Sequence, residues 1–333
     1  MLALSSPPIG VATTVHYTAR IPDDLKHGEW VGWPFDPTLA DRSLPQLVDA
    51  RVPRKVLLRS ARTKDFSIRR HGFELRHWPT QVRNFDDSSA VLRDYVPEVE
   101  ALVSHALESS GARGIRAIVV WDLCLCSSEL VNEFQQGAVQ TASEQAAGRA
   151  LDRLAPVPLA HADFYSARDV YRRLRQRWTT PTDTLSTYMD VRGAFASKGL
   201  SQGADLERCL ASRVVSVNVW RSIDFHHPVR RCPLALCDPG SLTAPADELV
   251  PFEICCPDVS FAEAHVLADG REGSHRWVHY PRMCHDECLL FVSGDTAGRW
   301  AAAPHTSVDD PRTTASDPPR TSIEARVFVI FDS

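Results

Sequence analysis

Apolar residues recur at helical spacing over residues 88–109, the clearest helical stretch of the chain. The apolar positions are Val91, Leu92, Tyr95, Val96, Val99, Leu102, Val103, Ala106 and Leu107. Their i, i+3, i+4, i+7 repeat predicts an amphipathic helix. Pro97 falls inside it and is expected either to kink the helix or to begin a second one in its first turn. Gly111 and Gly114 end the pattern.

Short apolar runs bounded by Pro, Gly and Asp dominate the rest of the chain. They cover residues 115–125, 156–162, 213–221, 233–237, 249–256, 276–281, 287–293 and 322–331. Many short strands of this kind indicate an all-β sandwich or barrel rather than alternating α/β units. A helical hairpin is expected from about 166 to 210, and the polar residues 127–150 predict a surface helix or an insertion that acts as an active-site lid. The predicted fold class is therefore mainly β with flanking helices.

The N-terminal part of the chain has a different pattern. Residues 1–87 carry scattered aromatic residues between turn residues and short apolar runs, which predicts irregular structure with short strands. We expect them to form an extension packed on a core made of residues 88–333, the two together making one structural unit. A chain of 333 residues is long enough to bury a full hydrophobic core.

Composition narrows the classes of partner. A net charge of −5 with basic residues spread along the chain gives no electrostatic footprint for nucleic acid. No stretch approaches the roughly 18 apolar residues of a membrane span, and the N-terminus lacks the pattern of a signal peptide. Nine cysteines without a secretion signal indicate reduced thiols in the cytoplasm. The sequence thus predicts a cytoplasmic protein with a small-molecule substrate, and it leaves the oligomeric state open.

The most informative chemistry is His161-Ala162-Asp163, followed far downstream by His305. Two histidines and one carboxylate are the ligands of mononuclear non-haem Fe(II) sites, where open positions remain for a co-substrate and dioxygen. The apolar run before His161 predicts a strand, on which His161 and Asp163 share one face and Ala162 lies on the other. With 13 histidines in the chain a single His-x-Asp is weak evidence, so the prediction depends on this context.

Arg320 and Ser322 follow the second histidine and stand two residues apart on a predicted strand. They therefore share a face, and the guanidinium fork of Arg320 could hold the distal carboxylate of 2-oxoglutarate while Ser322 adds a hydroxyl. We expect Arg320 to govern 2-oxoglutarate affinity more than Arg326, which could pair with Glu324 or another acid instead.

Cysteines and histidines between 232 and 288 raise a rival hypothesis, a zinc-dependent hydrolase. The residues concerned are Cys232 with Cys237, Cys255 with Cys256, Cys284 with Cys288, and His275, His279 and His285. None of the pairs has the Cys-x-x-Cys spacing of a structural zinc knuckle. The spacing of His275 and His279 lacks the Glu of the helical His-Glu-x-x-His motif and falls in a strand-like run. Buried cysteines packed as small apolar residues are the better account.

Six blocks of the C-terminal half carry a family resemblance. They are Asn218-Val219-Trp220-Arg221; Pro233–Asp238; His275–Trp277 with Tyr280–Met283; Asp286–Phe291; Pro304–Thr306 with Asp309–Pro311; and Arg320–Arg326. In this order they resemble the CmcJ-like family, which includes gibberellin desaturase-like and cephem-hydroxylase-like oxygenases. The resemblance extends over roughly residues 90 to 331.

The resemblance implies a double-stranded β-helix (jelly-roll, cupin-like) oxygenase that uses Fe(II), 2-oxoglutarate and O2. It implies His161, Asp163 and His305 as catalytic metal ligands, Arg320 with Ser322 as the 2-oxoglutarate anchor, Arg326 as the second candidate anchor, and Asn218, Trp220 and Arg221 as residues near the substrate. The implied reaction belongs to secondary-metabolite biosynthesis: hydroxylation, desaturation or oxidative C–N ring closure such as aziridine formation, on substrates that include amino-acid-derived molecules. The alternative is a non-catalytic β-sandwich binding protein.

One strand offers a test of the substrate assignments. Residues 219 and 221 share one of its faces and residues 218 and 220 the other, so only one of Asn218 and Arg221 can point into the barrel unless the strand bulges. If Arg221 points inward, it is expected to clamp a substrate carboxylate. If it points outward, a structural ion pair is expected instead.

Overall fold

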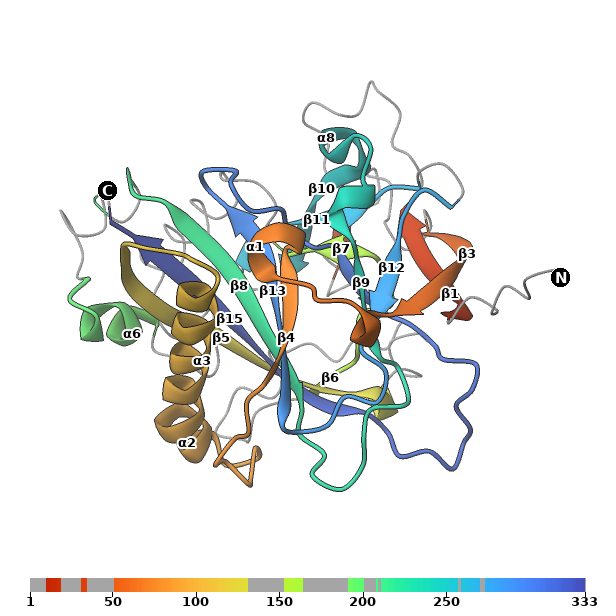
Figure 1. Cartoon of the computed structure of the whole chain (residues 1–333), viewed down its shortest axis with the longest axis horizontal. Coiled ribbons are helices and arrows are strands. Elements are labelled where there is room, and N and C mark those ends of the chain that lie inside the picture. The colour runs from red at the N-terminus through yellow and green to blue at the C-terminus, as the bar shows by residue number, and fades with distance from the viewer. Residues whose placement is uncertain are drawn as a thin grey trace, which may run out of the picture.

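The computed structural model describes residues 10–18, 31–34, 51–130, 153–163, 191–200, 208, 211–256, 259–269 and 273–332. Within these ranges the strands form two sheets, one of nine strands and one of six (Figure 1). Most of the segment expected at 127–150 and of the helical hairpin expected at 166–210 lies outside the described residues.

The nine-stranded sheet mixes strands from both ends of the chain. In spatial order it contains β1 (Gly10–Thr18), β3 (Arg51–Ser60), β12 (Trp277–His279), β9 (Leu234–Cys237), β14 (His305–Ser307), β7 (His161–Ala162), β11 (Val259–Leu267), β10 (Leu249–Cys256) and β2 (Val31–Pro34). Most neighbours are antiparallel; β12 with β3 and β10 with β2 are parallel.

The six-stranded sheet holds the longest strands. In spatial order it contains β4 (Phe73–His77), β13 (Glu287–Asp295), β8 (Val214–Ser222), β15 (Thr321–Phe331), β5 (Ile115–Ser127) and β6 (Arg153–Leu154). The helices are α1 (Ile68–His71), α2 (Ser88–Ala90), α3 (Val96–Ser109), α6 (Val191–Ser197) and α8 (Pro245–Glu248), with 3-10 turns at Ala61–Thr63, Ser128–Leu130 and Pro239–Ser241.

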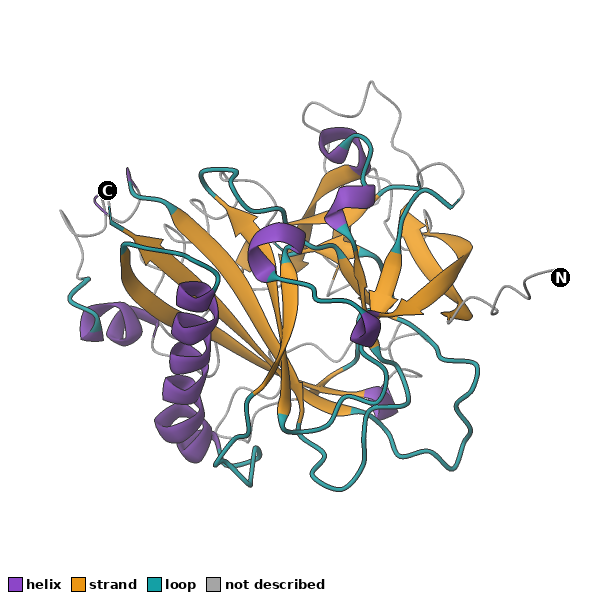
Figure 2. Ribbon diagram, in the orientation of Figure 1, coloured by secondary structure: helices purple, strands orange, loops and turns teal. Residues whose placement is uncertain are grey.

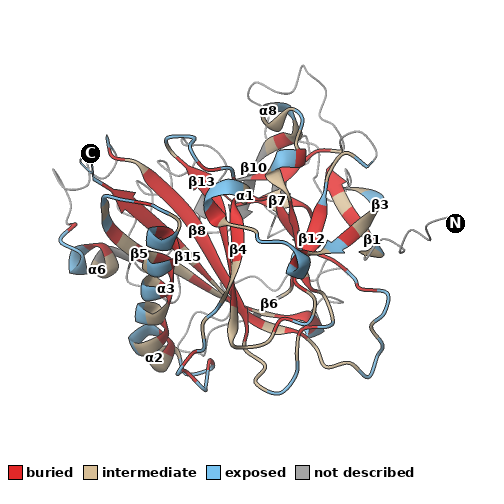
Figure 3. Cartoon of the chain, in the orientation of Figure 1, coloured by how far each residue is buried: buried red, intermediate tan, exposed pale blue. Residues whose placement is uncertain are grey.

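Helix α3 covers the outer face of the six-stranded sheet (Figure 2). Its buried stripe, including Val99, Leu102 and Val103, joins one apolar cluster with residues of β5, β8 and β15. The alternation along β5 is clear: Leu123 and Leu125 are buried in this cluster, while Asp122, Cys124 and Cys126 keep some exposure. The outward face of α3 is exposed (Figure 3), as expected for an amphipathic helix packed on a sheet.

A second apolar cluster lies between the two sheets. Trp220, Leu289 and Phe291 of the six-stranded sheet pack there with Leu236 and Val278 of the nine-stranded sheet. All nine residues of β8 are buried, since this central strand is covered by α3 on one side and by the other sheet on the opposite side. The mainly β class with flanking helices is therefore what the structure has.

The helix expected over residues 88–109 is present, and Pro97 acts as a start rather than a kink. A π-helical turn at Val91–Tyr95 follows α2, and α3 then begins at Val96 with Pro97 in its first turn. The π-helical turn before it accommodates the proline, whose missing N–H cannot bond a carbonyl oxygen of the preceding turn. Gly111 and Gly114, with φ of 85° and 70°, lead the chain out of the helix and into β5.

The N-terminal residues are built into both sheets and are not an extension packed on a separate core. Strand β1 pairs with β3, β3 pairs with β12, and β4 pairs with β13 along its whole length. The sequence pattern did not indicate that β3 pairs inside a sheet, because β3 carries Pro53 and several basic residues, which are typical of edge strands. Strands from before and after the expected boundary at residue 87 therefore pair within the same sheets.

The strand expected at 156–162 is shorter than expected. Only His161–Ala162 pairs as β7, with an isolated bridge at Leu159. Pro156 and Pro158 lack the N–H groups that a continuous ladder needs. Strands β11 and β14 were not predicted as separate elements, and β14 carries one of the proposed metal ligands.

Candidate metal centre

His161, Asp163 and His305 converge in the structure. His161 on β7 pairs directly with His305 on β14, and Asp163 follows β7 by one residue. One ligand atom of each of the three side chains lies within 4.8 Å of the others. Nε2 of His161 is 3.8 Å from Oδ1 of Asp163, and the two imidazole ring centroids are 4.3 Å apart. Ala162, between the ligands, is buried in the cluster on the other face of the sheet.

Both histidines are oriented by their own backbone. Nδ1 of His161 lies 2.7 Å from the carbonyl oxygen of Leu159, and Nδ1 of His305 lies 3.2 Å from that of Ala303. In each case Nδ1–H donates, which leaves the lone pair on Nε2 for a metal. Burial lowers the pKa of His161 to about 4, and burial also lowers the pKa of His305. The two rings are therefore neutral, the protonation state that binds a metal ion.

Asp163 is held through one oxygen. Its Oδ2 accepts hydrogen bonds from Nδ2 of Asn218 at 2.6 Å and from Nε of Arg326 at 3.3 Å. Burial by itself would raise the pKa of Asp163, but the charge of Arg326 and the hydrogen bond from Asn218 outweigh it and hold the pKa below the ordinary value. The carboxylate is thus ionised, and Oδ1 faces His161.

Arg326 is saturated by carboxylates. Besides Asp163 it contacts Asp122 at 2.7 Å and Glu324 at 3.1 Å. Asp122 lies opposite Arg326 in the β5–β15 ladder. Glu324 also accepts from Nδ2 of Asn218 at 2.9 Å. Such a cation with three acidic partners stabilises the ionised Asp163, and its Nε, NH1 and NH2 groups are all engaged by these acids.

Arg320 has the opposite environment. The residue is 5% exposed, yet within the described residues its guanidinium has one hydrogen-bond acceptor, the carbonyl oxygen of Cys232, 2.6 Å from NH1. Nε of Arg320 and Oγ of the buried Ser322 have no partner within the described residues. Burial lowers the pKa of Arg320. An isolated buried cation is costly, so this pair of side chains is poised for an anion.

The strand β8 divides the three expected substrate residues between two faces. Asn218 points to Asp163, and the Trp220 ring lies under Arg320, whose guanidinium carbon is 5.5 Å from the ring centroid. Arg221 is on the other face and does not join them. Its guanidinium donates to the carbonyl oxygens of Trp78 at 2.8 Å and His285 at 3.3 Å.

The expectation that Arg221 clamps a substrate is therefore corrected. It is 1% exposed and lies over the ring of Tyr95, on the side of the sheet that α3 covers. The alternative expectation, an ion pair, is not what holds it either, because its partners are carbonyl oxygens and the thiol of Cys288. The side-chain parity of a strand sets this outcome, since residues 218 and 220 already face the metal centre.

His275, one of the histidines of the zinc hypothesis, has other partners. Nε2 of His275 is 2.8 Å from Glu248 and its Nδ1 is 3.3 Å from the hydroxyl of Tyr17. Within the part of the chain that the structure describes, His161, Asp163 and His305 are the one group of three or more potential metal-binding side chains. Cys237 and Cys288 are buried free thiols there, which agrees with cysteines that pack as small residues, whereas the free thiols of Cys232 and Cys284 keep some exposure.

Sequence reasoning missed two residues around the candidate metal centre, Asp122 and Ser293. Asp122 holds Arg326 together with Glu324, whose pairing with Arg326 the sequence had indicated. The hydroxyl of Ser293 donates to Oδ1 of Asn218 at 2.7 Å. That contact turns the Asn218 amide so that its NH2 group faces Asp163. Asp122 and Ser293 lie on other strands than the residues they contact, so no spacing along the sequence indicates them.

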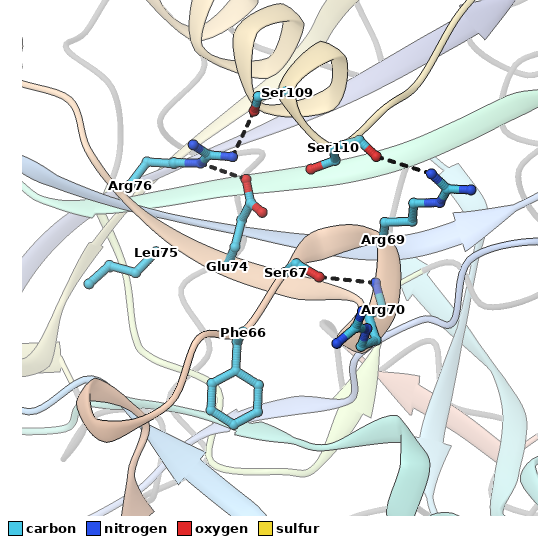
Figure 4. A pocket seen from close by; sticks show the side chains of 9 residues that line it. All are labelled: Phe66, Ser67, Arg69, Arg70, Glu74, Leu75, Arg76, Ser109 and Ser110. Atoms are coloured by element: carbon cyan, nitrogen blue, oxygen red, sulfur yellow. Dashed lines mark hydrogen bonds and ion pairs between the residues drawn. The ribbon is translucent and has the colours of Figure 1, made fainter.

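A cavity of about 760 Å³ lies away from the candidate metal centre, between α1, β4 and the end of α3 (Figure 4). Its side chains are tied to one another: Arg76 contacts Glu74 at 2.7 Å and Ser109 at 2.9 Å, and Arg69 contacts the carbonyl oxygen of Ser110 at 3.4 Å. These contacts join β4 to α3, and the cavity holds none of the residues discussed above.

None of the helices in the described part of the chain has the length and the apolar character needed to cross a membrane.

Comparisons with known proteins agree with the geometry. A family described as an oxidoreductase/YMDC permease-like domain matches residues 38–196 and 193–330. The chain is 23% identical over 306 residues to the alpha-ketoglutarate-dependent dioxygenase phiK of Fungal sp. (strain ATCC 74256), covering 88% of this chain and 92% of that protein. It is 25% identical over 283 residues to the hydroxylase/desaturase efuI of Hormonema carpetanum, covering 80% of each.

A solved structure shows the same fold. The iron and alpha-ketoglutarate-dependent endoperoxidase NvfI superposes with a TM-score of 0.69 and 19% identity, covering 98% of this chain and 99% of that chain. The expected jelly-roll core is thereby confirmed.

Proposed function

We propose that this chain, which belongs to the family described as an oxidoreductase/YMDC permease-like domain and is a CmcJ-like Fe(II)/2-oxoglutarate-dependent oxygenase, oxidises a small molecule. The oxidation takes place at an unactivated C–H bond, at an iron centre held by His161, Asp163 and His305. The proposal includes Arg320 and Ser322 as the anchor of the distal carboxylate of 2-oxoglutarate. Asn218 and Arg326 position Asp163.

One observation carries this proposal. Two neutral histidines and one ionised aspartate converge on the side of the sheet where a buried arginine and a buried hydroxyl have no anionic partner among the described residues. The donor set of two nitrogens and one carboxylate suits Fe(II) and leaves coordination positions for a co-substrate and dioxygen. The unpaired Arg320 suits a dicarboxylate whose other end lies at the metal.

When bound, Fe(II) with 2-oxoglutarate and dioxygen supplies the oxidant that removes a hydrogen atom from the substrate. The protein's own work is positioning. The carbonyl oxygens of Leu159 and Ala303 fix the imidazole tautomers. Asn218 and Arg326 hold Oδ2 of Asp163, which leaves Oδ1 for the metal. The ring of Trp220 supports Arg320 from below, and the carbonyl oxygen of Cys232 sets its direction.

The reaction belongs to the oxidative tailoring of small molecules. The relatives of this chain are named as a dioxygenase and as a hydroxylase/desaturase. We therefore propose hydroxylation, desaturation or oxidative ring closure as the outcome, with amino-acid-derived molecules among the candidate substrates. We further place the enzyme in the reducing cytoplasm without nucleic-acid or membrane partners. Free thiols among the described residues and a modest net charge of −5 support this.

The test is metal analysis of the anaerobically purified chain, combined with succinate release on addition of 2-oxoglutarate and candidate substrates. We expect one Fe(II) per chain and succinate formation that depends on it. His161→Ala, Asp163→Ala and His305→Ala should each abolish iron binding or turnover while circular dichroism shows an intact fold. A variant with normal iron content and turnover would remove that residue from the centre. Iron binding without any binding of 2-oxoglutarate would contradict the assigned co-substrate.

A further inference from the structure

Two cysteines lie next to each other on the inner face of β5. Their sulfur atoms are 3.7 Å apart, and Cys124 and Cys126 both keep some exposure. Leu123 and Leu125 alternate with them and are buried in the cluster under α3. The thiol pair therefore faces away from α3, toward the side of the sheet that holds the metal centre, and the proposed reaction makes no use of it.

The pairing of β5 with β15 fixes the neighbours of the two thiols. Cys126 is directly opposite Ser322, and Cys124 is directly opposite Glu324. Side chains in such positions have Cβ atoms about 4.5–5.5 Å apart. The thiols thus lie in the same wall as the Arg320–Ser322 anchor. The hydrogen bond between the two thiols raises the pKa of Cys124 and, together with the charge of Arg320, holds the pKa of Cys126 below its ordinary value against the effect of burial.

The spacing of the thiols fits a chelated metal ion better than a disulfide. Alternate residues of a strand are about 6.6–6.8 Å apart at Cα, whereas most disulfides have Cα atoms about 5.5–6 Å apart. A tetrahedral ion with metal–sulfur bonds of about 2.3 Å separates its two sulfur ligands by about 3.8 Å. The observed 3.7 Å is close to that separation without any movement of the strand.

We propose that Cys124 and Cys126 form a binding site for a thiophilic metal ion such as Zn(II), Cd(II) or Cu(I), separate from the His161–Asp163–His305 centre. Thiolates select soft ions, whereas the imidazole and carboxylate donors of the other centre suit Fe(II). Binding forms two metal–sulfur bonds and releases the thiol protons to solvent. Water or the carboxylate of Glu324 completes the coordination.

Occupation of the thiol site hinders the binding of 2-oxoglutarate. An ion held by Cys126 and its water ligands fill space beside Ser322, where the distal carboxylate is proposed to lie. This second part rests on the proposed function. It makes the oxygenase sensitive to soft metal ions at a place other than its iron centre.

The site itself is tested by titrating Cd(II) into the full chain under anaerobic conditions and following the ultraviolet sulfur-to-cadmium charge-transfer absorption. We expect saturation at one equivalent in the wild-type chain and in the Asp163→Ala/His305→Ala variant, because the signal reports thiolate ligands alone. Cys124→Ser and Cys126→Ser should each lower the affinity by more than the roughly 10–100-fold that loss of an outer partner costs. Cys284→Ser, a thiol elsewhere in the fold, is the matched control and should bind as wild type does.

An absorption that persists in the Cys124→Ser/Cys126→Ser variant, or is absent from the wild-type chain, overturns the proposal. If a serine variant does not fold, the corresponding alanine variant replaces it. The second part is tested by titrating 2-oxoglutarate into Mn(II)-loaded protein with and without Cd(II). We expect Cd(II) to weaken binding at least tenfold in the wild type and not in the double variant. Equal weakening in both refutes the second part, and failure of both to bind 2-oxoglutarate without Cd(II) refutes the proposed function instead.

Discussion

At the scale of single residues, Arg326 on β15 and Arg320 directly before it differ in what surrounds them. Arg326 contacts three carboxylates and supports Asp163. Among the residues that the structure describes, Arg320 contacts a backbone carbonyl and an aromatic ring but no carboxylate. The same side-chain type therefore has two roles six residues apart, and the surrounding charges decide which role each takes.

Arg320→Ala is expected to weaken 2-oxoglutarate binding by about 2–5 kcal/mol, because a charge-assisted bidentate pair is lost and the carboxylate stays desolvated. Arg320→Lys should recover only part of this, since an ammonium cannot form the planar fork. Arg326→Ala should instead lower iron affinity and stability. Calorimetric titration of 2-oxoglutarate into the Mn(II)-loaded variants measures the difference. A larger loss of 2-oxoglutarate affinity at Arg326 would reverse the assignment.

Asn218→Ala is expected to lower Fe(II) affinity by about 10–100-fold, the usual effect of removing a partner of a metal-ligating side chain. The reason is that Asn218 donates to Oδ2 of Asp163 and is itself fixed by Ser293. Ser216→Ala, on the same strand and the same face, is the matched control and should leave the affinity unchanged. Chelator competition measures both. Equal affinities in the two variants would show that Asn218 does not support the ligand.

At the scale of elements, parity along β8 explains why Arg221 is a structural residue. Arg221→Ala is expected to lower the free energy of unfolding by about 2–4 kcal/mol, because two buried carbonyl oxygens lose their donor and a cavity opens. Arg221→Met fills the space and should cost less. Urea denaturation measures stability, and the KM for 2-oxoglutarate should stay unchanged in both variants. A raised KM without a loss of stability would return Arg221 to the site.

Long periodic elements were predictable, whereas partnerships between elements were not. The helix at 88–109 and strands β5, β8 and β15 carry enough repeats for sequence alone to place them. The ligands His161, Asp163 and His305 were found because their residue types are distinctive. Asp122 looked like an ordinary acid of a strand position, since only the register of β5 against β15 brings it to Arg326. Glu324 lies two residues from Arg326 on the same strand and was expected as its partner. Strand β3 was missed because its basic residues obscure the alternation.

At the scale of the whole molecule, one hydrogen-bonded group joins distant parts of the nine-stranded sheet. Trp277 of β12 donates to the hydroxyl of Tyr17 on β1 at 2.6 Å, and His275 links this hydroxyl to Glu248 before β10. Glu248 further accepts from the hydroxyl of Thr243 at 2.6 Å. The first and last thirds of the chain are thereby connected on the face of the sheet that points away from the metal centre.

We predict that the ionised Glu248 in this hydrogen-bonded group stabilises the fold and that its protonation contributes to acid unfolding. Burial would raise the pKa of Glu248, but its hydrogen bonds with Thr243, His275 and the backbone outweigh it and lower the pKa from 4.5 to about 2. A carboxyl whose pKa is lower in the folded than in the unfolded chain stabilises the fold above the unfolded-state pKa, and this stabilisation is lost as the pH falls through the folded-state value. We therefore expect Glu248→Gln to be less stable than wild type at pH 7, with the difference shrinking between pH 4.5 and about 2. Urea denaturation of both proteins across this range gives the difference directly, and the subtraction removes the other carboxyls that titrate there. A difference that stays constant with pH would mean that Glu248 contributes through packing alone.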